Sequence, residues 1–175
     1  WQSNFIFLAA YAWLALGLEL WRGGETLKIR QPFILREIAQ RYRYMLTQVA
    51  FNRGMLNIAL PYGGVLAFSM VSPFLIERVY GYGPKVTGYA ALLMGLAWMA
   101  GGFIARLQLG RSLLHKHRRA LTLMLPTSAI MLLVSSQYAN IYTLLVFAFV
   151  VHASCAMMFN IYFSECLGMF PQFAG

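Results

Sequence analysis

One apolar segment near the middle of the chain carries hydrogen-bonding, aromatic and flexible residues on a single helical face. The segment covers residues 55–76, and the spacing of these residues puts them on one side of an α-helix. Such a face can line a cavity for a small molecule, or it can pack against another helix through its small and polar members. The face consists of Asn57, Pro61, Gly64, Phe68 and Ser72, with Tyr62 and Ser69 on the adjacent arc.

A histidine in the last apolar segment, residues 142–163, is the most distinctive ionisable residue. An imidazolium is costly near the centre of an apolar helix in a bilayer, whereas imidazole itself titrates near neutral pH. His152 therefore has two interpretations: it relays protons, or it is a neutral residue that contacts a ligand or packs against a helix. Cys155, Phe159 and Tyr162 fall on its side of the helix. The candidate ligand-binding residues are thus Asn57, Tyr62, Phe68, Ser69, Ser72, His152, Cys155, Phe159 and Tyr162.

Carboxylates are missing from the centres of the apolar segments. The sequence also has no histidine, cysteine and carboxylate cluster with metal-ligand spacing, and no glycine-rich phosphate loop with Lys and Ser or Thr. These observations predict no catalytic residue, no metal and no cofactor, and they favour a protein that is not an enzyme. The acidic residues all fall at segment ends or between segments: Glu19, Glu25, Glu37, Glu77 and Glu165.

The composition indicates that these candidate residues sit in a membrane. Of the 175 residues, 60% are hydrophobic and only 11% are charged, whereas an average soluble domain has roughly 25% charged residues. A water-soluble fold with so few charges would expose large apolar patches. The net charge of +9 does not indicate nucleic-acid binding, because the basic residues lie between apolar segments and form no stripe across a polar domain.

Five apolar segments have about the length that a membrane-spanning helix needs, near 20 residues. The sequence therefore predicts an all-α membrane protein with five transmembrane helices. In the third segment Ala97, Gly101 and Ala105 recur at every fourth position, with Ala90 and Met94 on the same side. Small residues in this pattern let another helix approach closely. The five segments are residues 5–21, 55–76, 86–107, 120–138 and 142–163.

Lysine and arginine are concentrated in every second gap between these segments. Cytoplasmic loops of membrane proteins retain such residues during insertion, so we expect the N-terminus of the chain outside and its C-terminus in the cytoplasm. His115 and His117 are expected in the solvated part of the second basic gap. The two basic gaps hold Arg22, Lys28, Arg30, Arg36, Arg41, Arg43 and Arg53, and then Arg106, Arg111, Lys116, Arg118 and Arg119, which leaves Arg78 and Lys85 for the gap between them.

The first basic gap is long enough to separate two units. Apolar residues at helical spacing from Pro32 to about Arg53 predict an amphipathic helix, which either lies on the cytoplasmic leaflet or packs on its own protein. We expect the last helix of one bundle in residues 1–21, a cytoplasmic linker in residues 22–53, and the first four helices of a second bundle in residues 54–175.

This layout resembles the middle of a major facilitator superfamily transporter, from its sixth helix through the central linker to its tenth helix. One short segment is similar to the family's Pro-Glu-Thr-Leu ending, with Gly24 in place of the proline, and several others are similar to the Bcr/CflA multidrug-resistance subfamily. The basic loop at residues 106–119 occupies the place of a degenerate loop signature, without its acidic residue. The similar segments are Gly24-Glu25-Thr26-Leu27, Ala67 to Phe74 with its Ser-Pro-Phe ending, Thr87-Gly88-Tyr89, Gly101-Gly102 and Phe170-Pro171.

The resemblance implies a secondary active transporter, an antiporter that exports drugs or small molecules by alternating access in a bacterial inner membrane. Its expected partners are a small-molecule substrate, protons, membrane lipid and the remaining helices of the same polypeptide, one of which would carry the acidic coupling residue. Nucleic acid is not expected. Two alternatives remain: an exporter of a specific metabolite or siderophore on the same fold, and a non-transporting membrane scaffold or complex subunit.

Overall fold

The computed structural model describes residues 2–23 and 34–171, with the side chain of Asn4 excepted. The chain divides into two compact units, Trp1–Ile38 and Ala39–Ala174. The segment similar to Pro-Glu-Thr-Leu, the basic residues Lys28 and Arg30, and Trp1 lie outside the described residues. Within the described ranges the chain is helical, apart from short turns, and contains no strand.

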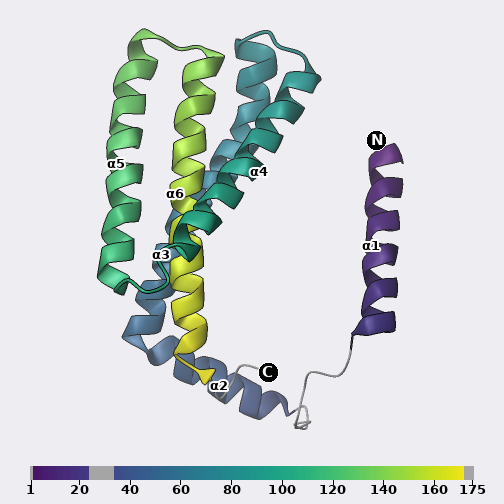
Figure 1. Cartoon of the computed structure of the whole chain (residues 1–175), viewed down its shortest axis with the longest axis vertical. Helices are drawn as coiled ribbons and strands as arrows, with labels where there is room; N and C mark the ends of the chain where they lie inside the picture. Colours follow the sequence, from purple (N-terminus) through teal and green to yellow (C-terminus); the bar gives the residue numbers. More distant parts are fainter. Residues whose placement is uncertain (1, 24–33, 172–175) are drawn as a thin grey trace. The chain divides into compact units, whose positions relative to one another are not determined.

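The first unit contains α1, Gln2–Arg22 (Figure 1). Its apolar stretch Phe5–Arg22 is long enough to cross a membrane, as the sequence predicted. The Arg22 guanidinium lies over the Trp21 ring, 5.0 Å from its centroid. A tryptophan with a basic neighbour at the end of an apolar helix is typical of the membrane–water interface.

The amphipathic helix α2, Leu35–Thr47, is shorter than the predicted segment. Gln48 takes an extended conformation and α3 begins at Val49, before the start expected from hydropathy at residue 55. Asn52 donates a side-chain hydrogen bond of 2.7 Å to the Leu46 carbonyl, so a polar side chain binds across the break between the helices. Hydropathy placed the start of α3 too late because residues 49–54 are helical without being strongly apolar.

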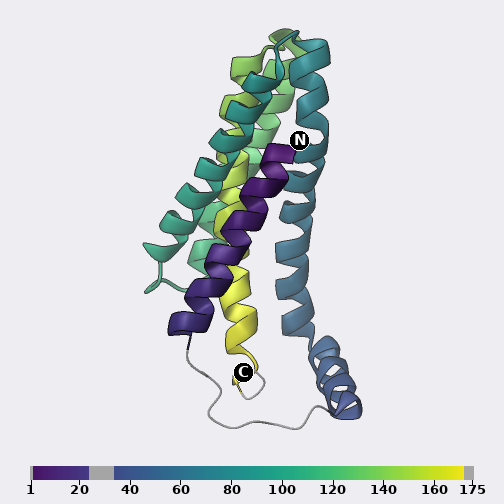
Figure 2. The same ribbon diagram turned by 90° about the vertical axis from the view of Figure 1, so that its right-hand side faces the viewer.

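The second unit is built from four long helices that are apolar enough to span a membrane (Figures 1 and 2). Together with α1 they give the five spans that the sequence predicted. The helices are α3, Val49–Phe74, continued by the π-helical turn η1, Leu75–Val79; α4, Pro84–Arg106; α5, Leu113–Gln137; and α6, Ile141–Gly168.

Helix α5 begins earlier than predicted. The Ser112 side chain accepts a hydrogen bond of 3.4 Å from the His115 backbone N–H, which caps the helix before Leu113. The basic residues 115–119 therefore lie on the first turns of α5, and the expectation that His115 and His117 belong to a loop is wrong. Hydropathy marks where a helix becomes apolar, whereas the capping residue marks where it starts.

Helix α6 is the centre of this unit. It contacts α3, α4 and α5, and in Figure 1 it lies between α4 and α5 with α3 behind it. Asn140 and Thr143 cap its first turn reciprocally, through a side-chain bond to each other's backbone N–H. Most of the unit's buried side chains belong to α6, so the other three helices pack mainly on this one.

The small-residue stripe of α4 is buried against another helix, as predicted, and that helix is α6. Ala90, Met94, Ala97, Gly101 and Ala105 are all buried. A Cβ atom added at Gly101 would overlap the backbone carbonyl of Ala153. The two backbones therefore meet at this glycine, which is the close approach that such a stripe permits.

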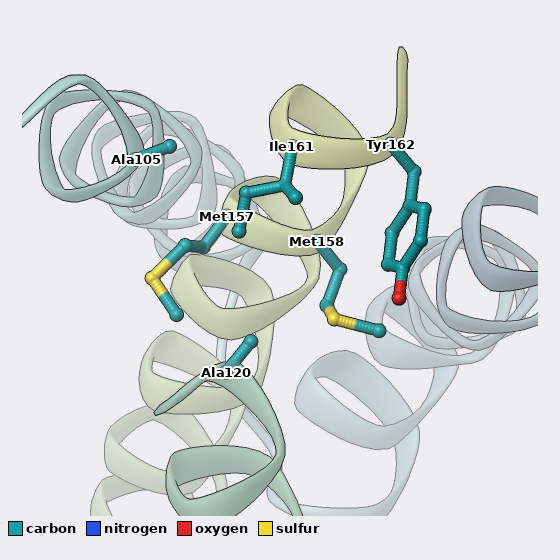
Figure 3. Close-up of a cluster of buried hydrophobic side chains, with 6 residues drawn as sticks. All are labelled: Ala105, Ala120, Met157, Met158, Ile161 and Tyr162. Carbon is teal, nitrogen blue, oxygen red and sulfur yellow. The ribbon is translucent and has the colours of Figure 1, made fainter. Parts of the chain in front are cut away.

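A cluster of buried side chains joins α4, α5 and α6 near their basic end (Figure 3). Met157 and Met158 are almost fully buried. In Figure 3 Met157 extends from α6 to the side of Ala105 of α4 and Ala120 of α5, whereas Met158 extends to the side on which Tyr162 lies. Alanines on the facing helices leave room for the long thioether side chains, which adapt to irregular gaps.

The turn between α3 and α4 is fixed by a wide helical turn and one glycine. Pro73 cannot donate a backbone hydrogen bond, and the helix widens directly after it, so that the Tyr80 N–H reaches back to the Leu75 carbonyl at 2.9 Å. The Thr87 hydroxyl donates to a Glu77 carboxylate oxygen at 2.8 Å, which ties the two helix ends together. Gly81 has φ +73°, a conformation that glycine adopts without strain.

Candidate functional site

A partly open cavity of about 480 Å³ lies among α3, α4 and α6. It sits in the middle of these helices, at a distance from the charged residues at their ends. Its walls are aromatic and apolar, and the polar groups on the lining side chains are the hydroxyls of Tyr62 and Ser69, the indole N–H of Trp98 and the imidazole of His152. The lining residues are Tyr62, Val65 and Ser69 of α3, Ala91, Met94, Gly95 and Trp98 of α4, and His152 and Phe159 of α6.

Three aromatic rings from three helices meet at this cavity. The Trp98 ring centroid is 5.9 Å from that of Tyr62 and 5.7 Å from that of Phe159. Tyr62 and Phe159 are 6.1 Å apart, so each ring contacts the other two. Their tilted and edge-to-face geometry is favourable for aromatic pairs. It leaves ring faces that can take a flat apolar ligand.

Phe159 is held from behind by a second ring. Phe163, one turn further along α6, stacks on it with centroids 5.4 Å apart and planes 11° from parallel. Stacking restricts the rotation of Phe159, so the wall that α6 gives to the cavity is positioned before any ligand binds.

The hydrogen bond of His152 determines which ring nitrogen carries the proton. Nδ1 lies 2.8 Å from the Ala148 carbonyl oxygen. A carbonyl only accepts, so Nδ1 donates, and in a neutral imidazole Nε2 is then an acceptor. Nε2 is buried and has no hydrogen-bond partner among the described residues. The ring of Phe68 meets the imidazole edge to face, with centroids 5.1 Å apart.

The cavity brings together four of the nine predicted binding residues. Tyr62, Ser69, His152 and Phe159 line it. Phe68 is not among the lining residues but contacts His152. On α3 the cavity is lined by Tyr62 and Ser69, which were placed beside the predicted binding face. The predicted face itself contributes only Phe68, through its contact with His152. The Ser69 hydroxyl donates to the Val65 carbonyl at 2.9 Å and keeps its lone pairs available.

The other four predicted residues lie elsewhere. The Asn57 side-chain amide donates to the Arg53 carbonyl of its own helix at 2.8 Å. Ser72 is half-buried and Cys155 is buried, and neither lines the cavity. Tyr162 packs in the core cluster, and its hydroxyl lies 2.7 Å from Nδ1 of His117 on α5. Helical spacing alone could not separate these residues, because it does not say which neighbour each face meets.

Sequence reasoning missed the α4 wall, of which Trp98 is the largest member. Ala91, Met94, Gly95 and Trp98 recur at spacings of three and four along one face of α4. These residues lie beside the small-residue stripe of α4. A tryptophan next to a helix-packing stripe could have indicated that Trp98 belongs to a site.

The cavity contains no carboxylate. In the described part of the chain the acidic side chains belong to α1, α2, η1 and the last turns of α6. No group of histidine, cysteine and carboxylate side chains among the described residues could hold a metal ion. The site is therefore built for apolar and aromatic contact with a small number of hydrogen bonds.

Comparisons with protein-family models, with curated proteins and with solved structures found no match to this chain.

Proposed function

We propose that this chain forms part of a secondary active transporter of the major facilitator type, and that the cavity among α3, α4 and α6 is part of its substrate site. The observation that carries the proposal is an aromatic cavity in the middle of three apolar, membrane-length helices. Transporter sites lie near the bilayer midplane, between bundles that rock against each other.

The chemistry of the walls supports an apolar aromatic substrate such as a drug-like molecule. Three rings offer faces for stacking, and Met94 adds an adaptable thioether. The unpaired Nε2 of His152 is an acceptor, so the substrate that satisfies it carries an N–H or O–H donor. Nε2 is closed from solvent in this conformation, and a substrate would reach it when the helices move during transport.

The same geometry favours substrate contact over proton relay for His152. A relay residue exchanges protons with a neighbouring titratable group, and neither the cavity nor the contacts of His152 provide a carboxylate. We propose that export is driven by proton antiport, with the coupling carboxylate outside this chain.

Uptake into inside-out membrane vesicles tests the proposal. The protein that contains this chain should accumulate a lipophilic aromatic substrate when the vesicle interior is acidic, and a protonophore should abolish the uptake. Trp98→Ala should lower kcat/KM by up to about tenfold, since an aromatic contact contributes about 0.5–1.5 kcal/mol. Phe103→Ala is the matched control, because this α4 aromatic is exposed and does not line the cavity.

His152→Phe separates substrate contact from proton coupling. It removes both ring nitrogens but keeps an aromatic side chain, so we expect weaker substrate binding with the gradient dependence retained. The substitution removes the unpaired Nε2 together with the Nδ1 hydrogen bond to Ala148. The Ala148 carbonyl lies inside α6 and keeps its helical backbone hydrogen bond, so the unfolding midpoint should change little. Two outcomes would contradict the proposal: wild-type uptake that does not depend on the proton gradient, or an equal loss of kcat/KM in Trp98→Ala and Phe103→Ala.

A further inference from the structure

A second cavity, of about 250 Å³, lies at the basic end of the second unit. It is formed where α4 ends, α5 begins and α6 ends, so it is separate from the aromatic cavity in the middle of the helices. Since these are three membrane-length helices, their ends fall at the level of lipid headgroups. The position of the cavity therefore exposes it to lipid headgroups as well as to water.

The cavity contains charges of both signs. Arg106 at the end of α4 and Lys116 in the first turns of α5 line it together with Glu165 in the last turns of α6. Among the described residues, none of these three side chains forms an ion pair with another. If these charges served only to hold the helix ends together, Glu165 would form an ion pair with Arg106 or Lys116. Since it does not, the three charges remain available to a ligand.

Hydroxyl and apolar groups complete the cavity. Ser164 adds a hydroxyl beside Glu165, and Leu109 and Leu113 provide apolar walls. Leu109 is 70% exposed, which is unfavourable in water but suits contact with the first carbons of a lipid. A free phosphate would contact the two cationic side chains but would make no contact with the two leucines.

We propose that this cavity binds the headgroup of an aminophospholipid, with the phosphate between Arg106 and Lys116 and the primary ammonium facing Glu165. Basic pockets between transmembrane helices bind phosphate-bearing headgroups, and hydrogen bonds between charged groups are stronger than neutral ones. The two cations match the phosphate, and the carboxylate matches the ammonium. This site does not depend on the proposed transport function.

Glu165 determines the choice of lipid. An anionic lipid without an amine, such as phosphatidylglycerol, would bring no positive group to the carboxylate, so nothing would offset the repulsion between Glu165 and its phosphate. Phosphatidylcholine has a quaternary ammonium, which cannot donate a hydrogen bond to Glu165. We therefore expect phosphatidylethanolamine to bind more tightly than either.

Lipid titration of the purified protein in detergent, read by native mass spectrometry, tests the assignment. The wild type should bind phosphatidylethanolamine roughly tenfold more tightly than phosphatidylglycerol or phosphatidylcholine, the effect of one charge-assisted bond. Arg106→Gln and Lys116→Gln should each weaken that binding about tenfold. Arg119→Gln is the matched control, because it removes the same charge from α5 at a residue that does not line the cavity.

Glu165→Gln tests the specificity directly. It should abolish the preference for phosphatidylethanolamine over phosphatidylglycerol while the binding of phosphatidylglycerol stays the same or improves. Equal weakening by Arg119→Gln and Arg106→Gln would overturn the site in favour of general attraction between a basic surface and lipid. A wild type that binds the three lipids equally, or a preference that survives Glu165→Gln, would overturn the aminophospholipid assignment. The unfolding midpoint of each variant verifies that it is folded.

Discussion

At the scale of single residues, the contact between α4 and α6 depends on Gly101 having no side chain. The nearest atoms to an added Cβ would be the Ala153 carbonyl oxygen and the Ala156 Cβ. A backbone carbonyl inside a helix cannot turn aside as a flexible side chain can. Any side chain at this position therefore pushes two helices apart, although alanine is the better helix former.

Gly101→Ala should destabilise the protein by about 1–3 kcal/mol, the usual cost of overpacking a tight contact. Gly102→Ala is a control from the next position, where the nearest atom to an added Cβ is Asn160 Nδ2 at 3.6 Å, an ordinary contact distance. Unfolding of the purified protein in detergent measures both. Equal unfolding midpoints for Gly101→Ala and Gly102→Ala would contradict this prediction, because they would show that α4 and α6 can move apart at Gly101 at little cost.

At the scale of elements, α6 forms the common wall of the second unit. Its buried side chains meet three different helices, and those helices have few contacts with one another. Substitutions on its buried positions should therefore cost more than equivalent substitutions on the helices around it.

Met157→Ala should cost about 2–5 kcal/mol, because it leaves a cavity where a nearly fully buried side chain stood. It also removes the sulfur that accepts a hydrogen bond of 3.3 Å from the Gln108 amide. Met99→Ala is the matched control, since the Met99 side chain on α4 is 55% exposed. Detergent unfolding curves compare the two, and similar losses would contradict the role of α6 as the shared wall.

The sequence allowed the helices to be predicted better than their partners. The five spans and the buried stripe of Ala97, Gly101 and Ala105 followed from hydropathy and spacing, which depend on local composition. The start of α5 did not, because the Ser112 cap lies ahead of the apolar residues. Nor did the α4 wall of the cavity: Trp98 becomes a site residue only when α4 is set beside Tyr62 and Phe159, and that arrangement depends on contacts distant in sequence.

At the scale of the whole molecule, basic side chains gather at one end of the second unit's helices. Arg53, Arg106 and residues 115–119 lie at the end where α3 and α5 begin and α4 stops, whereas Arg78 and Lys85 flank the turn at the other end. The asymmetry of lysine and arginine sets the orientation of membrane proteins. We therefore predict that the end with Arg106 faces the cytoplasm.

Cysteine labelling measures this orientation. In sealed cells a membrane-impermeant maleimide should label Lys85→Cys and leave Arg118→Cys unlabelled, and in inside-out vesicles the pattern should reverse, because only one end is accessible in each case. Both positions are exposed. The unsubstituted protein gives the background, since Cys155 and Cys166 are buried. Labelling of Arg118→Cys in sealed cells would contradict the predicted orientation.

The central position of α6 has a consequence for biosynthesis. Translation proceeds from the N-terminus, so α3, α4 and α5 reach the bilayer before the helix on which all three pack. Until α6 is inserted, the Gly101 face of α4 and the Ala120 face of α5 lack the helix on which they pack. The packing of α3, α4 and α5 is therefore completed only after α6 has been inserted.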